Sequence, residues 1–126
     1  MKQLIEKIEN SNFLNDKQKV LLVESISVGG SVSVDIRKVQ TEIKLEILKI
    51  LYANNEPLTI TEICDNFTVD NGYSYTVQRF SAMANQLRRM GLLDKIYITT
   101  GNYLIIKGRG KEPEKIAKFF IKTIDK

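Results

Sequence analysis

One stretch near the middle of the chain constrains the fold more than any other: residues 73–90, YSYTVQRFSAMANQLRRM. At 100° per residue, its apolar side chains form a narrow seam along a helix, namely Val77, Phe80, Ala84 and Leu87. The opposite side carries mainly amide and guanidinium groups and comprises Tyr75, Gln78, Arg79, Ala82, Gln86 and Arg89. The stretch contains no Asp or Glu, although a solvated helix face usually mixes both signs. We therefore predict an amphipathic helix over 74–90, capped by Ser74 and ended by Gly91.

The residues alone leave two interpretations of the polar side of this helix. It is either an ordinary solvated surface or a surface for nucleic acid, because Gln and Arg can each make two hydrogen bonds to a base edge and Arg also binds phosphate. Arg88 falls on the buried side of the wheel and is expected to form a structural ion pair. Met83 and Met90 flank the seam and are expected in the core or an interface.

Composition excludes several kinds of chemistry. The chain has no histidine, so it can form neither a catalytic Ser-His-Asp triad nor a His-ligated metal site. It has one cysteine, Cys64, so it can form neither an intrachain disulfide nor a multi-cysteine metal site. The phosphate-binding patterns GxxxxGK[ST] and GxGxxG do not occur. We expect no enzyme activity, no cofactor and no metal. Cys64 is expected to pack in the core, the alternative being an exposed thiol sensor.

Length and hydropathy indicate one soluble domain. The 126 residues suffice for one core, and contents of 43% hydrophobic and 27% charged residues are typical of globular proteins. No apolar run approaches the roughly 20 residues of a membrane span. The start MKQLIEKIEN carries acids where a signal peptide would not. A cytoplasmic protein without a membrane partner is therefore expected.

The net charge of +4 is distributed unevenly along the chain. Residues 1–57 hold eight basic and eight acidic side chains, whereas 71–111 hold seven basic residues against Asp94 alone. A concentration of positive charge of this kind is typical of a surface that binds a polyanion. It coincides with the helix that lacks carboxylates.

Capping residues, glycine and proline divide the chain into a series of elements. Helices are predicted at 1–9, from 15 or 16 to about 27, at 35–54 and, with Thr61 as N-cap, at 62–67, with a short strand at 58–60 and a turn at 68–72. Runs rich in Ile and Tyr at 93–99 and 102–107 predict a hairpin with TTGNY at its tip. Pro113 is expected to open a final helix to about Asp125, with an apolar stripe of Ile116, Phe119, Phe120 and Ile124.

Three segments in this order resemble a winged helix-turn-helix domain: EILKILYANNEPLTITEICDNF, YTVQRFSAMANQLRRMGLL and KIYITTGNYLIIK. Over about 36–108 the chain looks like the MarR-type and ArsR-type transcriptional regulators, most tellingly in the LRRMGLL exit from the long helix. The resemblance implies a mostly α fold with a small β-hairpin wing (α+β) and extra N- and C-terminal helices. It divides the chain into an N-terminal helical extension (1–30), a winged helix-turn-helix domain (31–111) and a C-terminal dimerisation helix (112–126).

The resemblance also implies a function. We expect a sequence-specific double-stranded DNA-binding protein, a dimeric transcriptional regulator with the 74–90 helix in the major groove and the 93–108 hairpin as wing. One alternative is a plasmid or phage DNA-partition adaptor, which binds centromere repeats and a further protein partner. The other is a winged-helix module for protein–protein interaction.

Docking of this kind assigns roles to individual residues. Tyr75, Gln78 and Arg79 are expected to meet bases, Ala82 to allow close approach, and Gln86 and Arg89 to meet the DNA backbone. Phosphate contacts are expected from Ser74, Thr76, Thr100, Asn102, Lys107, Arg109 and Lys111. Tyr103 either reaches the DNA or packs under the wing. A homodimer through residues 1–27 and 113–125 would set two such helices roughly 34 Å apart, about one turn of DNA.

Overall fold

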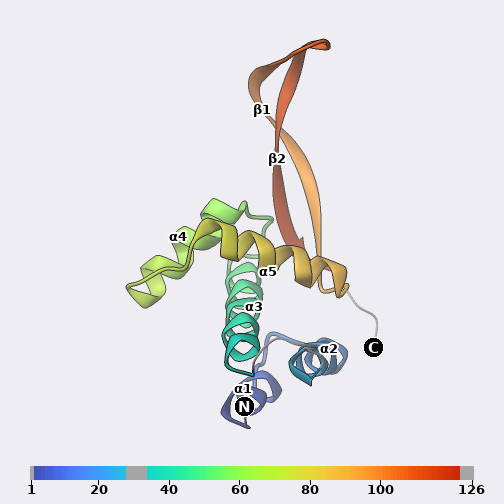
Figure 1. Ribbon diagram of the computed structural model, residues 1–126. Helices are drawn as coiled ribbons and strands as arrows, with labels where there is room; N and C mark the ends of the chain where they lie inside the picture. The colour runs from blue at the N-terminus through green and yellow to red at the C-terminus, as the bar shows by residue number, and fades with distance from the viewer. Residues whose placement is uncertain (1, 28–33, 123–126) are drawn as a thin grey trace.

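The chain folds into a helical body from which a long β-hairpin projects (Figure 1). The computed structural model describes residues 2–27 and 34–122. The elements in this part of the chain are α1 Lys2–Glu9, α2 Asp16–Ser27, α3 Val34–Asn54, α4 Ile60–Asn71, α5 Val77–Arg89, β1 Leu93–Ile106 and β2 Gly110–Ile121. The predicted mostly helical α+β chain with one antiparallel hairpin is confirmed, and the first three helices lie close to their predicted bounds.

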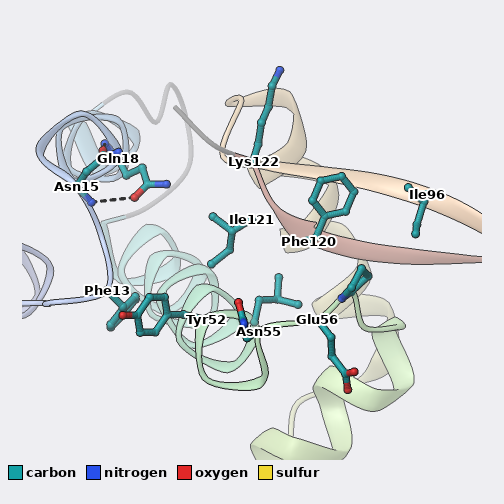
Figure 2. Close-up of a pocket in the computed structure, with 12 residues that line it drawn as sticks. Phe13, Asn15, Gln18, Tyr52, Asn55, Glu56, Ile96, Phe120, Ile121 and Lys122 are labelled. Carbon is teal, nitrogen blue, oxygen red and sulfur yellow. Dashed lines mark hydrogen bonds between the residues drawn. The ribbon is translucent and has the colours of Figure 1, made fainter. Parts of the chain in front are cut away.

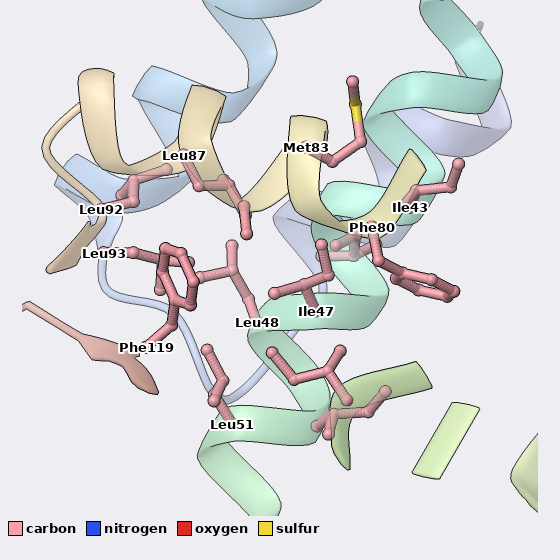
Figure 3. Close-up of a cluster of buried hydrophobic side chains, with 14 of the residues drawn as sticks. Ile43, Ile47, Leu48, Leu51, Phe80, Met83, Leu87, Leu92, Leu93 and Phe119 are labelled. Carbon is pink, nitrogen blue, oxygen red and sulfur yellow. The ribbon is translucent and has the colours of Figure 1, made fainter. Parts of the chain in front are cut away.

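The core of the body forms around α3. Helix α5 crosses α3 near the hairpin (Figure 1), and the two helices pack through buried aliphatic and aromatic side chains. Figure 3 shows Ile47 and Leu48 of α3 beneath Phe80 and Leu87 of α5, with Phe119 of β2 beside them. A fully buried side chain of this size stabilises the fold by about 1.5–3 kcal/mol relative to an exposed one. The core therefore holds α5 and the base of the hairpin against one helix.

Helices α1 and α2 pack against α3 at the end of the body opposite the hairpin (Figure 1). Their buried side chains, among them Leu4, Ile8 and Leu22, belong to the same core as α3. The Lys7 Nζ of α1 also lies 3.7 Å from the Glu46 Oε1 of α3. Helix α3 therefore covers much of the apolar surface of α1 and α2 within the chain, and dimerisation through residues 1–27 stays a prediction.

Helix α4 begins earlier and ends later than predicted. Its N-cap is Thr59, whose hydroxyl oxygen accepts a hydrogen bond from the backbone N–H of Glu62 at 3.1 Å. The Glu62 carboxylate in turn accepts from the Thr59 N–H at 3.0 Å, which completes a capping box. The helix ends at Asn71, and its C-cap Gly72 has a φ of 75°, a left-handed conformation that glycine adopts readily. Thr61 as N-cap and a turn over 68–72 were therefore wrong: capping at Thr59 satisfies two helix-end donors together.

Helix α5 starts later than predicted, because its N-cap is Thr76, two residues after the predicted cap Ser74. The Thr76 hydroxyl oxygen accepts from the backbone N–H of Arg79 at 3.2 Å. The predicted apolar seam is buried at Phe80, Ala84 and Leu87, and Met83 joins it. Val77, the first residue of the seam, is 45% exposed in the opening turn. The turn between α4 and α5 therefore runs over residues 72–76.

The hairpin is longer than predicted, and its tip lies elsewhere. Strands β1 and β2 pair from Leu93–Ile121 to Ile106–Gly110, and the reversal is closed by the Arg109 N–H donating to the Ile106 carbonyl at 3.0 Å. Gly108 and Gly110 have φ of 85° and 81° there, a conformation that glycine favours in tight turns. The predicted tip, residues 99–103, is instead an irregularity within β1, where three residues face one residue of β2. Such a bulge bends and twists a strand without reversing it.

The predicted C-terminal helix is wrong, since residues 110–121 form β2. The apolar spacing that suggested a helix, at Ile116, Phe119 and Phe120, belongs to a strand that supplies the backbone partners of β1. Leu58 adds a further pairing to β2: its N–H and carbonyl bond to Phe119 at 3.0 and 2.8 Å. The predicted 31–111 boundary therefore cuts through the hairpin. Of the predicted dimerisation helix at 112–126, residues 123–126 lie outside the described part of the chain.

Within residues 2–27 and 34–122, no helix has both the length and the apolar character needed to cross a membrane. The same ranges contain no group of three or more Cys, Asp or Glu side chains that could hold a metal ion.

Candidate functional site

The exposed side of α5 is the first part of the candidate site. Gln78, Arg79, Ala82 and Arg89 are exposed, and Gln86 is half-buried. Because α5 contains no Asp or Glu, this surface presents amide and guanidinium donors without a competing carboxylate on the same helix. The structure thus brings the predicted α5 residues onto one accessible surface.

An aromatic cluster supports the N-terminal end of this surface. The rings of Phe67, Tyr73, Tyr75 and Phe80 meet with centroids 5.4 to 6.1 Å apart. Tyr75 is half-buried among them, and burial raises the pKa of its hydroxyl, with the neighbouring Tyr73 as a smaller cause. The guanidinium carbon of Arg79 lies 5.7 Å from the centroid of the Tyr75 ring, a cation–π distance. Tyr75, predicted as a base contact, is therefore placed to support Arg79.

The two predicted phosphate ligands before α5 both make hydrogen bonds within the chain. Thr76 caps α5, as described above. The Ser74 hydroxyl donates to the Tyr75 carbonyl at 2.8 Å and lies 3.2 Å from the Sγ of Cys64. Cys64 itself is half-buried against the core, as predicted. Both hydroxyls remain on exposed residues, so a phosphate oxygen could accept from Thr76 while its capping bond persists.

The hairpin has two chemically different faces, since paired strand residues share a face and neighbours alternate. The first, which we call the lysine–tyrosine face, carries Lys95, Tyr97, Thr99, Tyr103 and Ile105 on β1 and Lys111, Pro113, Lys115 and, at the base, Ala117 and the buried Phe119 on β2. The second, the aliphatic face, carries Ile96, Ile98, Leu104 and Ile106 on β1 and Glu112, Glu114, Ile116, Lys118 and Phe120 on β2. The basic groups of the outer hairpin thus gather on one face.

Lysines stack on tyrosines along the lysine–tyrosine face. The Nζ of Lys111 lies 4.8 Å from the ring centroid of Tyr103, and that of Lys95 lies 5.3 Å from the ring of Tyr97. A hydrogen bond with Lys95 and its charge lower the pKa of the Tyr97 hydroxyl. Tyr103 is exposed, so it does not pack under the hairpin. The face combines flat rings with fixed positive charges, a combination that suits a nucleic-acid backbone.

The predicted wing residues occupy three different places on the hairpin. Lys107 and Arg109 lie in the turn at its end, and Arg109 also contacts Glu112 at 4.0 Å. Thr100 and Asn102 lie at the irregularity in mid-strand, where the Asn102 N–H donates to the Thr100 hydroxyl at 3.3 Å. A regular strand of 14 residues spans roughly 43 Å. The turn is therefore well separated from the α5 surface along the hairpin.

Sequence reasoning missed Lys95, Tyr97 and Lys115 on the lysine–tyrosine face. The signal was present as period-2 alternation, Lys95-x-Tyr97-x-Thr99 on one strand and Lys111-x-Pro113-x-Lys115 on the other. Arg88, predicted as a buried ion-pair partner, does pair with Asp94 at 3.7 Å but is exposed.

A comparison of the chain with protein-family models, curated proteins and solved structures finds no match.

Proposed function

We propose that the chain is a sequence-specific double-stranded DNA-binding protein of winged helix-turn-helix type, and that it acts as a homodimeric transcriptional regulator. Helix α5 would enter the major groove, and the lysine–tyrosine face of the hairpin would bind the sugar–phosphate backbone. The chain would act by binding alone, without a catalytic step.

The observation that carries the proposal is the exposed surface of α5. Gln78 and Arg79 lie in its first turn, the part of a recognition helix that reaches base edges in helix-turn-helix docking. Ala82, exposed one turn later, leaves room for the helix to approach a groove closely. A helix free of carboxylates meets no electrostatic penalty at a DNA surface.

The order of elements supports the proposal independently. Helices α3, α4 and α5 are followed by the hairpin, and Leu58, between α3 and α4, pairs with Phe119 of β2. A winged helix-turn-helix domain has this order, with a short strand between its first two helices joined to the wing. The length of the hairpin is the chief departure, since it would carry phosphate-binding groups much farther from α5 than a short wing does.

A titration of labelled duplex DNA by fluorescence anisotropy tests the proposal, with the duplex chosen by selection from a random pool. Arg79→Ala should cost about 1–3 kcal/mol of binding free energy on the selected site and flatten the preference among sequences. Lys111→Ala should weaken binding to all sequences alike and reduce the salt slope by about one unit.

Lys49→Ala is the matched control, because Lys49 is exposed on α3 beside α1 and its loop. It should change neither affinity nor salt slope. If the wild type selects no sequence and binds no duplex at low salt, the proposal fails, and a protein–protein module becomes the better description.

A footprint separates the two DNA-binding roles. One short protected palindrome is the result expected of a regulator. A long cooperative array of protected repeats would instead favour a partition adaptor.

A further inference from the structure

The aliphatic face of the hairpin presents several large apolar side chains to solvent. Ile96, Ile98, Leu104 and Ile116 are 41, 38, 49 and 40% exposed along it. Apolar surface of this kind is unfavourable in water, and larger exposed patches mark interaction sites. Its outer half also lies beyond the helical body (Figure 1). A two-stranded hairpin without a further layer is only marginally stable, so a covering partner would stabilise it.

The charges along β2 on this face are segregated about Ile116. Glu112 and Glu114 lie toward the turn, whereas Lys118 and, just past the end of the strand, Lys122 lie toward the body. A second copy packed in parallel would set like charges against each other. A second copy packed antiparallel about a twofold axis at Ile116 would set Glu114 of each copy against Lys118 of the other, and Glu112 against Phe120.

Two other charged groups near this face have neighbours within the chain. Asp94 pairs with Arg88 at 3.7 Å, and Lys118 lies near enough to Glu62 to contribute to lowering the pKa of that carboxyl, after its hydrogen bonds to Thr59. Glu112 is itself paired with Arg109 of the turn at 4.0 Å, so Glu114 is the acidic group of this face on which the proposed contact depends.

A cavity at the base of the aliphatic face fits the same arrangement. Its volume is 600 Å³, and its lining includes Phe13, Tyr52, Ile96 and Phe120 (Figure 2). Phe120 lies four residues from Ile116 toward the body, and Glu112, paired with Leu104, lies four residues from Ile116 toward the turn. The twofold axis at Ile116 would therefore bring Leu104 of one copy over the cavity of the other.

We propose that two copies of this chain dimerise through the aliphatic faces of their hairpins, packed antiparallel, with the outer hairpin of each copy covering the cavity at the base of the other. Because two-stranded ribbons twist strongly, the two hairpins would coil around each other. The lysine–tyrosine faces would remain exposed. This interface replaces the flanking helices as the site of dimerisation, and it does not depend on the proposed DNA binding.

Charge reversal at the two ends of β2 tests the proposal by sedimentation velocity of the full chain at roughly 20 µM, without DNA. The wild type should sediment at twice its chain mass of 14.4 kDa. The double variants Glu112→Lys/Glu114→Lys and Lys118→Glu/Lys122→Glu should each weaken the dimer by roughly 30-fold, since the two symmetry-related contacts between positions 114 and 118 become repulsive. An equimolar mixture of the two should regain a heterodimer within about threefold of the wild-type affinity.

Lys115→Glu on the lysine–tyrosine face is the matched control and should leave the dimer unchanged. Circular dichroism of each variant should show wild-type helix content, which separates loss of the dimer from loss of the fold. A monomeric wild type, or double variants that dimerise as well as the wild type, would overturn the proposal. A mixture that stays monomeric would also overturn it, because complementary charges would then have failed to restore the antiparallel pair.

Discussion

The helical body and the outer hairpin use apolar residues in opposite ways. In the body, Ile47 and Phe80 are fully buried between α3 and α5. In the hairpin beyond the irregularity, Ile105 is 89% exposed, and Tyr103 and Leu104 are about half exposed. The same residue types thus stabilise the chain in one region and remain available for contacts in the other. We infer that the body folds on its own packing and that the outer hairpin is built for contacts with other molecules.

Two isoleucines of the body and the hairpin provide the sharpest contrast. Ile47→Ala should lower the free energy of unfolding by about 2–5 kcal/mol, because it leaves a cavity in the packed core. Ile105→Ala should change it by less than about 0.5 kcal/mol, because the side chain is already in water. Urea denaturation monitored by circular dichroism measures both. Similar losses for the two variants would abolish the distinction between body and hairpin.

The capping box of α4 should have a smaller effect on the body. Thr59→Ala removes the hydroxyl that accepts from the Glu62 N–H and should cost about 1 kcal/mol. Thr61 lies two residues further along the chain and is exposed, so Thr61→Ala should cost less than about 0.5 kcal/mol. The same denaturation experiment ranks the two threonines. A larger loss at Thr61 would mean that α4 begins where its sequence first suggested.

The same cap predicts a modest acid sensitivity of the body. The hydrogen bond from the Thr59 backbone is the main cause of the lowered pKa of Glu62. Its contribution is therefore complete above the ordinary pKa of about 4.3 and is lost as the pH falls through the lower folded value. Because Glu62 is partly exposed, we expect only a few tenths of a kcal/mol. Glu62→Gln should lose stability at pH 7 and show a shallower decline below pH 5. Parallel pH curves for the two proteins would contradict this role.

Removing the outer hairpin should have the smallest effect on the body. A variant in which an Asn-Gly turn replaces residues 100–114 joins Thr99 to its partner Lys115 directly. Measured below the concentration at which the chain dimerises, its unfolding free energy should stay within about 0.5 kcal/mol of the wild type. A much larger loss would show that the body depends on the distal hairpin.

Sequence patterns predicted the body better than the hairpin. The 3.6-residue period and the capping residues located α1, α2 and α3 closely, because burial of one helix side determines both sequence and structure there. The hairpin was ambiguous, since Ile116, Phe119 and Phe120 suit a helix as well as a strand. What decides between them is the long-range pairing of β2 with β1 and Leu58, which local spacing does not encode.

The part of the candidate site on α5 was predicted from the sequence, but the part on the hairpin was not. The exposed α5 residues Gln78, Arg79 and Ala82 followed from the helical wheel. The sequence predicted the hairpin turn at Gly101, whereas the structure has it at Gly108. Local sequence does not distinguish the two positions, because both glycines sit in polar segments that can reverse a strand. The two-faced hairpin appeared only once the register was known, since a shift of one residue exchanges the faces.

Amide chemical-shift mapping of the chain during titration with its selected duplex tests the central claim most directly. We predict that the largest changes fall on α5 near Arg79 and on the lysine–tyrosine face, including Lys111, while α1 and α2 remain unchanged. Changes that concentrate on α1 and α2, or a spectrum that does not change at saturating DNA, would contradict the account.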